Sequence, residues 1–169
     1  MPKPARFRHR YLPLLLLKAR EAVMQHRRPM LRAHGLSDQQ WRVLRVLAEP
    51  AHAEGLDTGR LARESHLLGP SLTGMLTRME AAGLVQRARS AEDARRSVVS
   101  ATDEGLALAA ALRADIEAQY QDLETHMSQP KLAQLYALLD ELIALHPTEE
   151  EETEAMQDHA GMRLTETAA

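Results

Sequence analysis

The chain has 169 residues, enough for one domain with a buried core, and no cysteine, which excludes disulfide frameworks, thiolate zinc sites and cysteine nucleophiles. Its net charge of −3 hides an asymmetry: residues 1–100 carry 18 Lys and Arg against 9 Asp and Glu, whereas residues 101–169 carry 3 against 15. A basic first part beside an acidic second part suggests a surface that faces nucleic acid, although a solvated charge gradient would give the same numbers.

Apolar side chains at roughly helical spacing, among them Met24 and Leu31, predict a long first helix over residues 12–33. Pro29 is expected to kink this helix. The run of four leucines at residues 14–17 is far shorter than the roughly 20 apolar residues that span a bilayer. We therefore expect a soluble, cytoplasmic protein with no membrane partner.

The second helix is predicted to begin at Asp38. Ser37 and Gln40 have the spacing of a capping box, in which each side chain bonds to the backbone N–H of the other residue. Leu36 and Trp41 stand at the two positions of a hydrophobic staple, which fixes the entry of the chain into a helix. These local signals together place the start of the helix.

After a loop that ends at Asp57, Thr58 is expected to cap a short third helix that ends at His66. A fourth helix is predicted from Gly69, with Pro70 at its first position, to a left-handed stop at Gly83. Its apolar stripe is expected to face the core and consists of Leu72, Met75, Leu76 and Met79. The outward face carries small polar side chains and one arginine, namely Ser71, Thr73, Gly74, Thr77 and Arg78.

The periodicity then changes to that of strands. Residues 84–89 alternate like a half-buried strand, residues 97–101 read as a returning strand, and the segment AEDARR lies between them. This pattern predicts a β-hairpin with a long charged tip. Its arginines are Arg87, Arg89, Arg95 and Arg96.

Thr102 is expected to cap a fifth helix of about six turns, and a sixth helix begins near Pro130 and ends near His146. The tail over residues 148–169 contains the run Glu149–Glu152 and few apolar side chains, so we expect it to be disordered.

This order of elements predicts a mainly α fold with a small β-hairpin, a winged helix-turn-helix. A helix enters the DNA major groove, roughly 12 Å wide, only with a slim outward face, and hydroxyls there can donate to phosphates or base edges. The hairpin arginines would lie beside the flanking backbone or the minor groove. A solvent-facing helix and a charged edge strand could have this composition without DNA, but their combination favours DNA binding.

The flanking helices are longer than the DNA-binding unit over residues 35–102 requires. We therefore expect residues 12–34 and 103–147 to form a dimerisation region. Two-fold symmetry would place two recognition helices about one DNA turn apart, on a pseudo-palindromic operator in double-stranded DNA. The alternative is a monomer that folds its own helices into a closed bundle.

Enzyme signatures are weak. Residues 128–131 match S-x-x-K but lack the accompanying S-D-N and K-T-G, and the eight histidines show no H-E-x-x-H pattern. We expect no catalytic residues, no metal and no cofactor. A helical adaptor that binds other proteins is a further alternative, although it would not need the hairpin arginines.

The hairpin tip and the helix after it carry a resemblance. Asp93-Ala94-Arg95, followed by Thr102 and Gly105, resembles the D-x-R wing signature and T-x-x-G helix start of MarR-type transcriptional regulators, and the similarity extends over residues 12–147. It departs at Ala101, where a leucine is commoner. The resemblance implies a winged-helix dimer joined through its terminal helices. It also implies that Asp93 braces the wing, while Arg95 contacts DNA or completes the brace.

Residues 18–49 and 69–85 resemble the subgroup of that family that regulates operons for homoprotocatechuate (3,4-dihydroxyphenylacetate) or 4-hydroxyphenylacetate degradation. This implies a repressor released by a small aromatic acid, and a different regulon and ligand is the alternative. In the family the inducer commonly lies where the first two helices meet. A carboxylate needs a cation and an aromatic ring needs an apolar wall. The expected ligand residues are Arg20, Met24, Trp41 and Arg45, with Arg42 as a substitute; alternatively Trp41 is only a staple and the arginines only form surface ion pairs.

Overall fold

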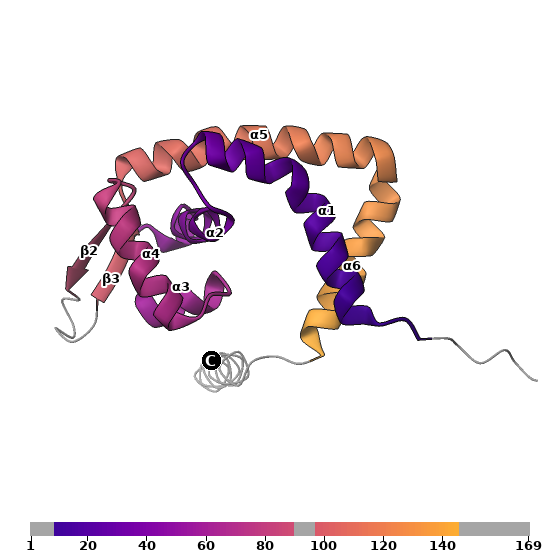
Figure 1. Cartoon of the computed structure of the whole chain (residues 1–169), viewed down its shortest axis with the longest axis horizontal. Coiled ribbons are helices and arrows are strands. Elements are labelled where there is room, and N and C mark those ends of the chain that lie inside the picture. The colour runs from indigo at the N-terminus through magenta and orange to yellow at the C-terminus, as the bar shows by residue number, and fades with distance from the viewer. Residues whose placement is uncertain (1–8, 90–96, 146–169) are drawn as a thin grey trace, which may run out of the picture. The chain divides into compact units, whose positions relative to one another are not determined.

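The computed structural model describes residues 9–89 and 97–145, and its contacts divide the chain into two units, residues 1–117 and 118–169 (Figure 1). The fold is mainly helical with a small antiparallel sheet, as the sequence predicted. The elements in chain order are α1 (Leu12–Ala33), α2 (Asp38–Leu47), the 3-10 turn η1 (Pro50–His52), β1 (Leu56–Asp57), α3 (Thr58–Glu64), α4 (Gly69–Ala81), β2 (Val85–Arg89), β3 (Ser97–Ala101), α5 (Asp103–Met127) and α6 (Gln129–Ala144). Among the described residues, no helix combines the length and apolar character of a membrane span.

α1 runs without interruption through Pro29, and Figure 1 shows that the helix changes direction along its length. Met24 and Leu31 are its buried residues. Other apolar side chains of α1 are exposed in the single chain, namely Leu12, Leu14, Leu16, Leu17 and Val23.

The predicted start of α2 is confirmed. The Ser37 hydroxyl accepts from the Gln40 N–H at 3.2 Å, and the Gln40 side chain accepts from the Ser37 N–H at 2.8 Å. Leu36 and Trp41 are both buried, as a hydrophobic staple requires.

The prediction for α3 was wrong in its details. Its cap is Asp57 rather than Thr58, because the Asp57 carboxylate accepts from the N–H groups of Gly59 and Arg60 at 2.9 and 3.0 Å. The helix ends at Glu64, two residues before the predicted end at His66. Pro70 occupies the second position of α4 rather than the first, because the N-cap is Leu68.

A third strand was also missed, because residues 50–57 were predicted to be a loop. β1 pairs with β3, so the sheet order is β1-β3-β2, with Leu56 opposite Val99 and Val85 opposite Ala101. The chain enters β1 through Gly55, whose φ is +83°. A Cβ there would lie 2.6 Å from the Val99 carbonyl oxygen, so only glycine lets the strands approach.

The core of the first unit lies among α2, α3, α4, the sheet and the first part of α5. The predicted inner stripe of α4 is confirmed, because all four of its side chains are buried. Fully buried side chains from neighbouring elements complete this core, among them Leu44, Leu61, Val99 and Leu112. In this way the opposite face of α4 is left at the surface.

In the second unit, α5 ends at Met127, Ser128 turns the chain with φ +67°, and α6 begins at Gln129. Leu132 is the buried residue of α6. Other leucines and one isoleucine recur at helical spacing along α6. Leu139 and Leu142 are half-buried, and Leu135, Leu138 and Ile143 are exposed.

Candidate nucleic-acid interface and ligand site

The outward face of α4 has the composition that the sequence predicted. Ser71, Thr73, Gly74, Thr77 and Arg78 are all exposed. The Thr77 hydroxyl donates to the Thr73 carbonyl at 3.2 Å, so its lone pairs are directed away from its own helix. The Arg78 guanidinium makes no hydrogen bond or ion pair with any residue that the structure describes. This face therefore presents hydroxyl acceptors and one available guanidinium.

Arg87, predicted to contact DNA, bonds within the protein. Its Nε donates to the Glu80 carboxylate at 2.9 Å, and its Nη2 lies 3.4 Å from the Thr77 hydroxyl. The hydrogen bond from Arg87 holds the pKa of Glu80 below its usual value. Because Arg87 is on β2 and Glu80 on α4, the pair ties the hairpin to the helix that carries the outward face.

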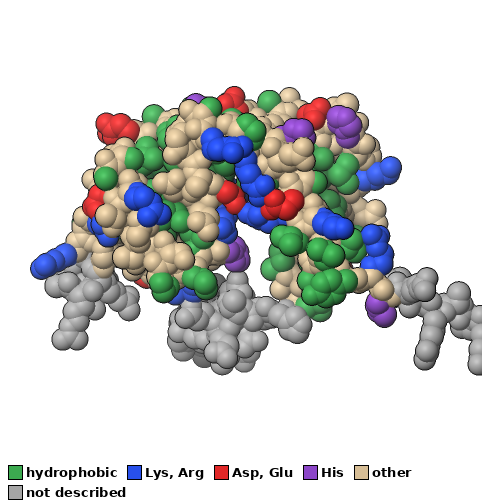
Figure 2. Space-filling view, viewed as in Figure 1, with side chains coloured by type: hydrophobic (Ala, Val, Ile, Leu, Met, Phe, Trp, Pro, Cys, Tyr) green, Lys and Arg blue, Asp and Glu red, His purple; other side chains and the backbone are tan. Residues whose placement is uncertain are grey.

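Arg89, at the end of β2, is exposed. Asp93, Arg95 and Arg96 lie outside the described residues. The sequence did not single out Arg60 and Arg63, which are exposed on α3; the basic charge of residues 1–100 was the only signal for them. Figure 2 shows Lys and Arg side chains at the surface over α3, α4 and the strands.

The T-x-x-G motif fastens the base of the hairpin to α5. The Thr102 hydroxyl donates to the Gly83 carbonyl and accepts from the Gly105 N–H at 3.0 Å. The Thr102 N–H donates to the Leu84 carbonyl at 3.2 Å. A Cβ on Gly105 would lie 2.1 Å from that same Leu84 oxygen, so the contact requires glycine. The predicted cap of the fifth helix is confirmed.

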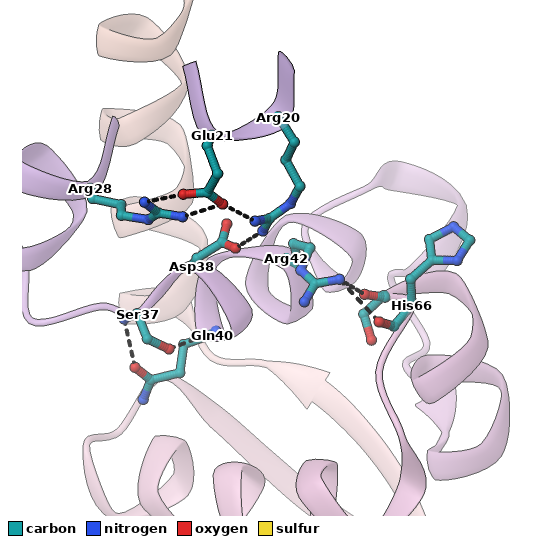
Figure 3. Close-up of polar contacts among 9 residues, drawn as sticks. Arg20, Glu21, Arg28, Ser37, Asp38, Gln40, Arg42 and His66 are labelled. Atoms are coloured by element: carbon teal, nitrogen blue, oxygen red, sulfur yellow. Dashed lines mark hydrogen bonds and ion pairs between the residues drawn. The ribbon is translucent and has the colours of Figure 1, made fainter. Parts of the chain in front are cut away.

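A polar network joins α1 to the start of α2 (Figure 3). The Arg20 guanidinium contacts the carboxylates of Asp38 and Glu21, the latter at 3.0 Å. Arg28, two turns after Glu21 on the same helix, binds its other oxygen at 2.7 Å. The hydrogen bond from Arg28 holds the pKa of Glu21 below its usual value. Two cations and two carboxylates therefore neutralise one another where the helices meet.

Comparison with known proteins identifies the family. The homoprotocatechuate degradative operon repressor of Escherichia coli is 42% identical to this chain over 144 residues, which are 85% of this chain and 95% of the repressor. The sequence profile of the MarR family matches residues 34–96. The chain belongs to the MarR family. It is a transcriptional regulator and not an enzyme.

Solved structures of other regulators have the same fold as this MarR protein. Transcriptional regulator PA4135 superposes with a TM-score of 0.76 at 40% identity and covers 82% of this chain and all of its own. NadR in complex with 4-hydroxyphenylacetate superposes with a TM-score of 0.71 at 38% identity, covering 86% of this chain and all of its own. The resemblance to the homoprotocatechuate subgroup is thus supported by the comparison of sequences and by the comparison of structures.

The predicted ligand residues of this MarR protein occupy different environments. Met24 and Trp41 are buried, with 8% and 7% of their surfaces exposed, whereas Arg20 and Arg45 are exposed. Arg20 lies at the junction of α1 and α2, where its guanidinium contacts Asp38. Asp38 is one turn before Trp41 on α2. Arg42 is directed elsewhere, toward the turn after α3 (Figure 3).

Sequence reasoning missed the carboxylates around Arg20. An open pocket of about 620 Å³ lies along α1, and none of the predicted ligand residues lines it; its lining includes Glu21 and Arg28. Glu21 and Arg28 are seven residues apart, which places them two turns apart on one face of α1. This spacing was a signal that could have revealed their ion pair. No such signal existed for Asp38, because its contact with Arg20 arises only when α1 packs on α2.

Proposed function

We propose that this protein is a homodimeric, sequence-specific DNA-binding repressor of an aromatic-acid catabolic operon, and that a small aromatic carboxylate releases it from DNA. The observation that carries the proposal is the outward face of α4: slim, exposed, backed by a fully buried stripe and adjacent to a basic hairpin. A helix with such a face fits the major groove.

In this proposal Ser71, Thr73, Gly74, Thr77 and Arg78 enter the major groove. Arg89, Arg95 and Arg96 contact the flanking backbone or minor groove, and Asp93 braces the wing. Arg87 acts first through Glu80, by holding the wing against α4. Exposed hydroxyls and a guanidinium can read base edges, while the wing arginines add affinity that does not depend on sequence.

Exposed apolar side chains support the homodimer. On α1, Leu17 is 54% exposed, and on α6, Ile143 is 69% exposed, each among several neighbours of the same kind. Figure 2 shows hydrophobic side chains at the surface. Several exposed apolar side chains on one helix are typical of protein–protein interfaces. A second copy of the chain would cover it and would supply the second recognition helix of a two-fold operator.

The aromatic ligand is inferred from two relatives, the homoprotocatechuate degradative operon repressor and NadR in complex with 4-hydroxyphenylacetate. A ligand carboxylate could replace Asp38 or Glu21 as a partner of Arg20, because all three are carboxylates. Met24 and Trp41 would form the apolar wall and Arg45 a second cation. Arg42, predicted as a substitute, is left out of the ligand site because its guanidinium binds the carbonyls of Ser65 and His66. Release from DNA then follows if the ligand binds better to a dimer whose recognition helices are wrongly spaced.

Fluorescence anisotropy on the protein's own upstream DNA tests DNA binding. We expect tight binding. The logarithm of the association constant should fall linearly with the logarithm of the salt concentration, because phosphate contacts release counterions. Arg78→Gln should lower affinity by roughly 5–150-fold, the equivalent of about 1–3 kcal/mol for a base contact. Arg32→Gln, the same charge change on α1, serves as the control. Absence of binding, or a flat salt response, would contradict the proposal.

Calorimetric titration with 4-hydroxyphenylacetate and 3,4-dihydroxyphenylacetate tests the ligand site. We expect binding by the wild type and at least tenfold weaker binding by Arg20→Gln, because a charge-assisted hydrogen bond contributes about 1.5–3 kcal/mol. In the anisotropy assay the same acids should release the wild type from DNA. If Arg20→Gln and Arg32→Gln bind the acids equally well, Arg20 is not a ligand residue.

A further inference from the structure

Arg42 joins α2 to the turn between α3 and α4. Its Nη1 donates to the carbonyl oxygens of Ser65 and His66, at 2.9 and 3.0 Å (Figure 3). The neighbouring residues Trp41 and Val43 are buried, so the α2 backbone from which Arg42 projects packs against the core. One guanidinium nitrogen thus holds two consecutive carbonyls of another element.

These two carbonyls lie where α3 ends. The last carbonyls of a helix have no partners within it, and a cation there also interacts favourably with the helix dipole. The His66 backbone adopts a left-handed conformation, with φ +49°, that residues other than glycine rarely adopt. The Leu67 N–H closes the turn on the Ala62 carbonyl at 2.8 Å. The turn therefore has a strained residue that is held by an external donor.

α4 begins directly after this turn, and no side chain caps its first backbone N–H groups. Its N-cap is Leu68, whose side chain makes no capping hydrogen bond. Ser65, by contrast, is 1% exposed, so the near end of the turn is anchored in the core. The direction in which α4 leaves therefore depends in part on how residues 65–68 are held, and Arg42 is the side chain of α2 that bonds to them.

We propose that Arg42 is a positioning residue that sets the orientation of α4 from α2 and transmits a ligand-dependent shift of α2 to the DNA-binding face. This inference rests on the proposed function and adds to it the route by which the ligand acts. Trp41 and Arg45, proposed ligand residues, lie on the same short helix. A displacement of α2 by a bound acid moves the Arg42 anchor, and the turn after α3 moves with it.

Two variants separate the donor from the rest of the side chain. Arg42→Met keeps an unbranched apolar stem but removes the donors. Arg42→Lys keeps a charged donor, and it also removes the buried Nε, which has no hydrogen-bond partner in the structure. Arg32→Met is the matched control, because the Arg32 Nε bonds only within its own helix, to the Arg28 carbonyl at 3.3 Å. All variants are made in the full chain, with thermal midpoints measured first.

Amide hydrogen exchange of the free protein tests the anchor. Arg42→Met should speed exchange in peptides that cover residues 65–73 by about tenfold or more, because each bond to a charged donor contributes to local closure. Arg42→Lys should restore much of the protection, and Arg32→Met should change nothing there. Unchanged exchange in Arg42→Met overturns the inference, and this measurement needs neither operator nor ligand.

Operator affinity with and without 4-hydroxyphenylacetate tests transmission. In the wild type we expect a coupling factor of roughly 5–150-fold between acid and operator, the usual range for such coupling. Arg42→Met should reduce this factor toward one while acid binding by calorimetry stays intact, and Arg42→Lys should recover part of it. An unchanged factor in Arg42→Met overturns transmission by Arg42, whereas a wild type that does not bind operator overturns the proposed function itself.

Discussion

At the scale of single residues, Gly105 shows how a helix start can depend on an absent side chain. Its N–H bonds to Thr102, and the Leu84 carbonyl occupies the space that a Cβ would fill. A backbone oxygen cannot rotate away as a flexible side chain can. The glycine of the T-x-x-G motif is therefore required by packing against the base of the wing rather than by an unusual backbone conformation.

We expect Gly105→Ala to lower the free energy of unfolding by about 1–3 kcal/mol, because the new methyl group forces α5 away from Leu84. Gly74→Ala is the matched control on α4, where the atom nearest to an added Cβ, an Arg78 nitrogen, would lie 3.8 Å away. That substitution should stabilise the protein by up to about 1 kcal/mol. Urea denaturation of both variants measures the difference, and equal stabilities would show that the helix start adjusts freely.

The partners of Arg42 and Arg87 could not be predicted from the sequence. Both were expected to contact a ligand or DNA because arginine is suited to both. The structure instead gives Arg42 two carbonyls of the α3–α4 turn and gives Arg87 the Glu80 carboxylate. These partners lie on other elements, so only the packed fold brings them within reach.

At the scale of elements, the start of α2 and the stop after α4 were predicted correctly from adjacent residues, whereas the cap of α3 was assigned to Thr58 instead of its neighbour Asp57. The Ser37–Gln40 box and the left-handed Gly83, at φ +71°, each act within a few residues. β1 was missed because a strand of two residues has no periodicity and exists only through its pairing with β3. The spacing of the apolar side chains predicted α1 and α6 as helices. That spacing does not say whether the surface that covers those side chains belongs to the same chain or to a second copy.

The Glu80–Arg87 pair couples α4 to β2. Two possible roles of Arg87 predict opposite effects of Glu80→Gln on operator binding. If Arg87 positions the wing, Glu80→Gln should weaken operator binding in the anisotropy assay, because the hairpin loses its tie to α4. If Arg87 contacts DNA directly, the same substitution should strengthen binding, because it frees a cation. We expect weaker binding. An exchange such as Glu104→Gln, at an exposed carboxylate of α5, provides the charge-matched control.

The same pair predicts a pH dependence. Because Arg87 lowers the pKa of Glu80 in the folded protein, the pair stabilises the fold above the ordinary glutamate pKa. This contribution is lost as the pH falls through the lowered value. Wild type should therefore have a higher thermal midpoint than Glu80→Gln at neutral pH, and the difference should disappear in acid. A constant difference across this range would show that the carboxylate stabilises by another route.

At the scale of the whole molecule, the exposed apolar side chains predict the oligomeric state. Ile143→Glu places a charge on the exposed stripe of α6 and should shift the protein from dimer to monomer in analytical ultracentrifugation, because an unpaired buried charge is costly at an interface. Operator affinity should fall with it. Gln134→Glu, also exposed on α6, should leave the dimer intact. A wild type that sediments as a monomer would contradict the proposed two-fold recognition.

The attachment of α5 at Gly83 and Leu84 determines which end of the hairpin tolerates a longer connection. At the base of the hairpin, Thr102 after β3 bonds to the carbonyls of Gly83 and Leu84 before β2, so the two ends of the hairpin are held together there. The pair of Arg89 and Ser97 lies at the other end of the paired strands from this attachment. Lengthening a loop costs little, about 0.6 kcal/mol per doubling. An insertion in the connection between Arg89 and Ser97 should therefore leave the thermal midpoint nearly unchanged, because the attachment at Gly83 and Leu84 lies at the opposite end of the ladder.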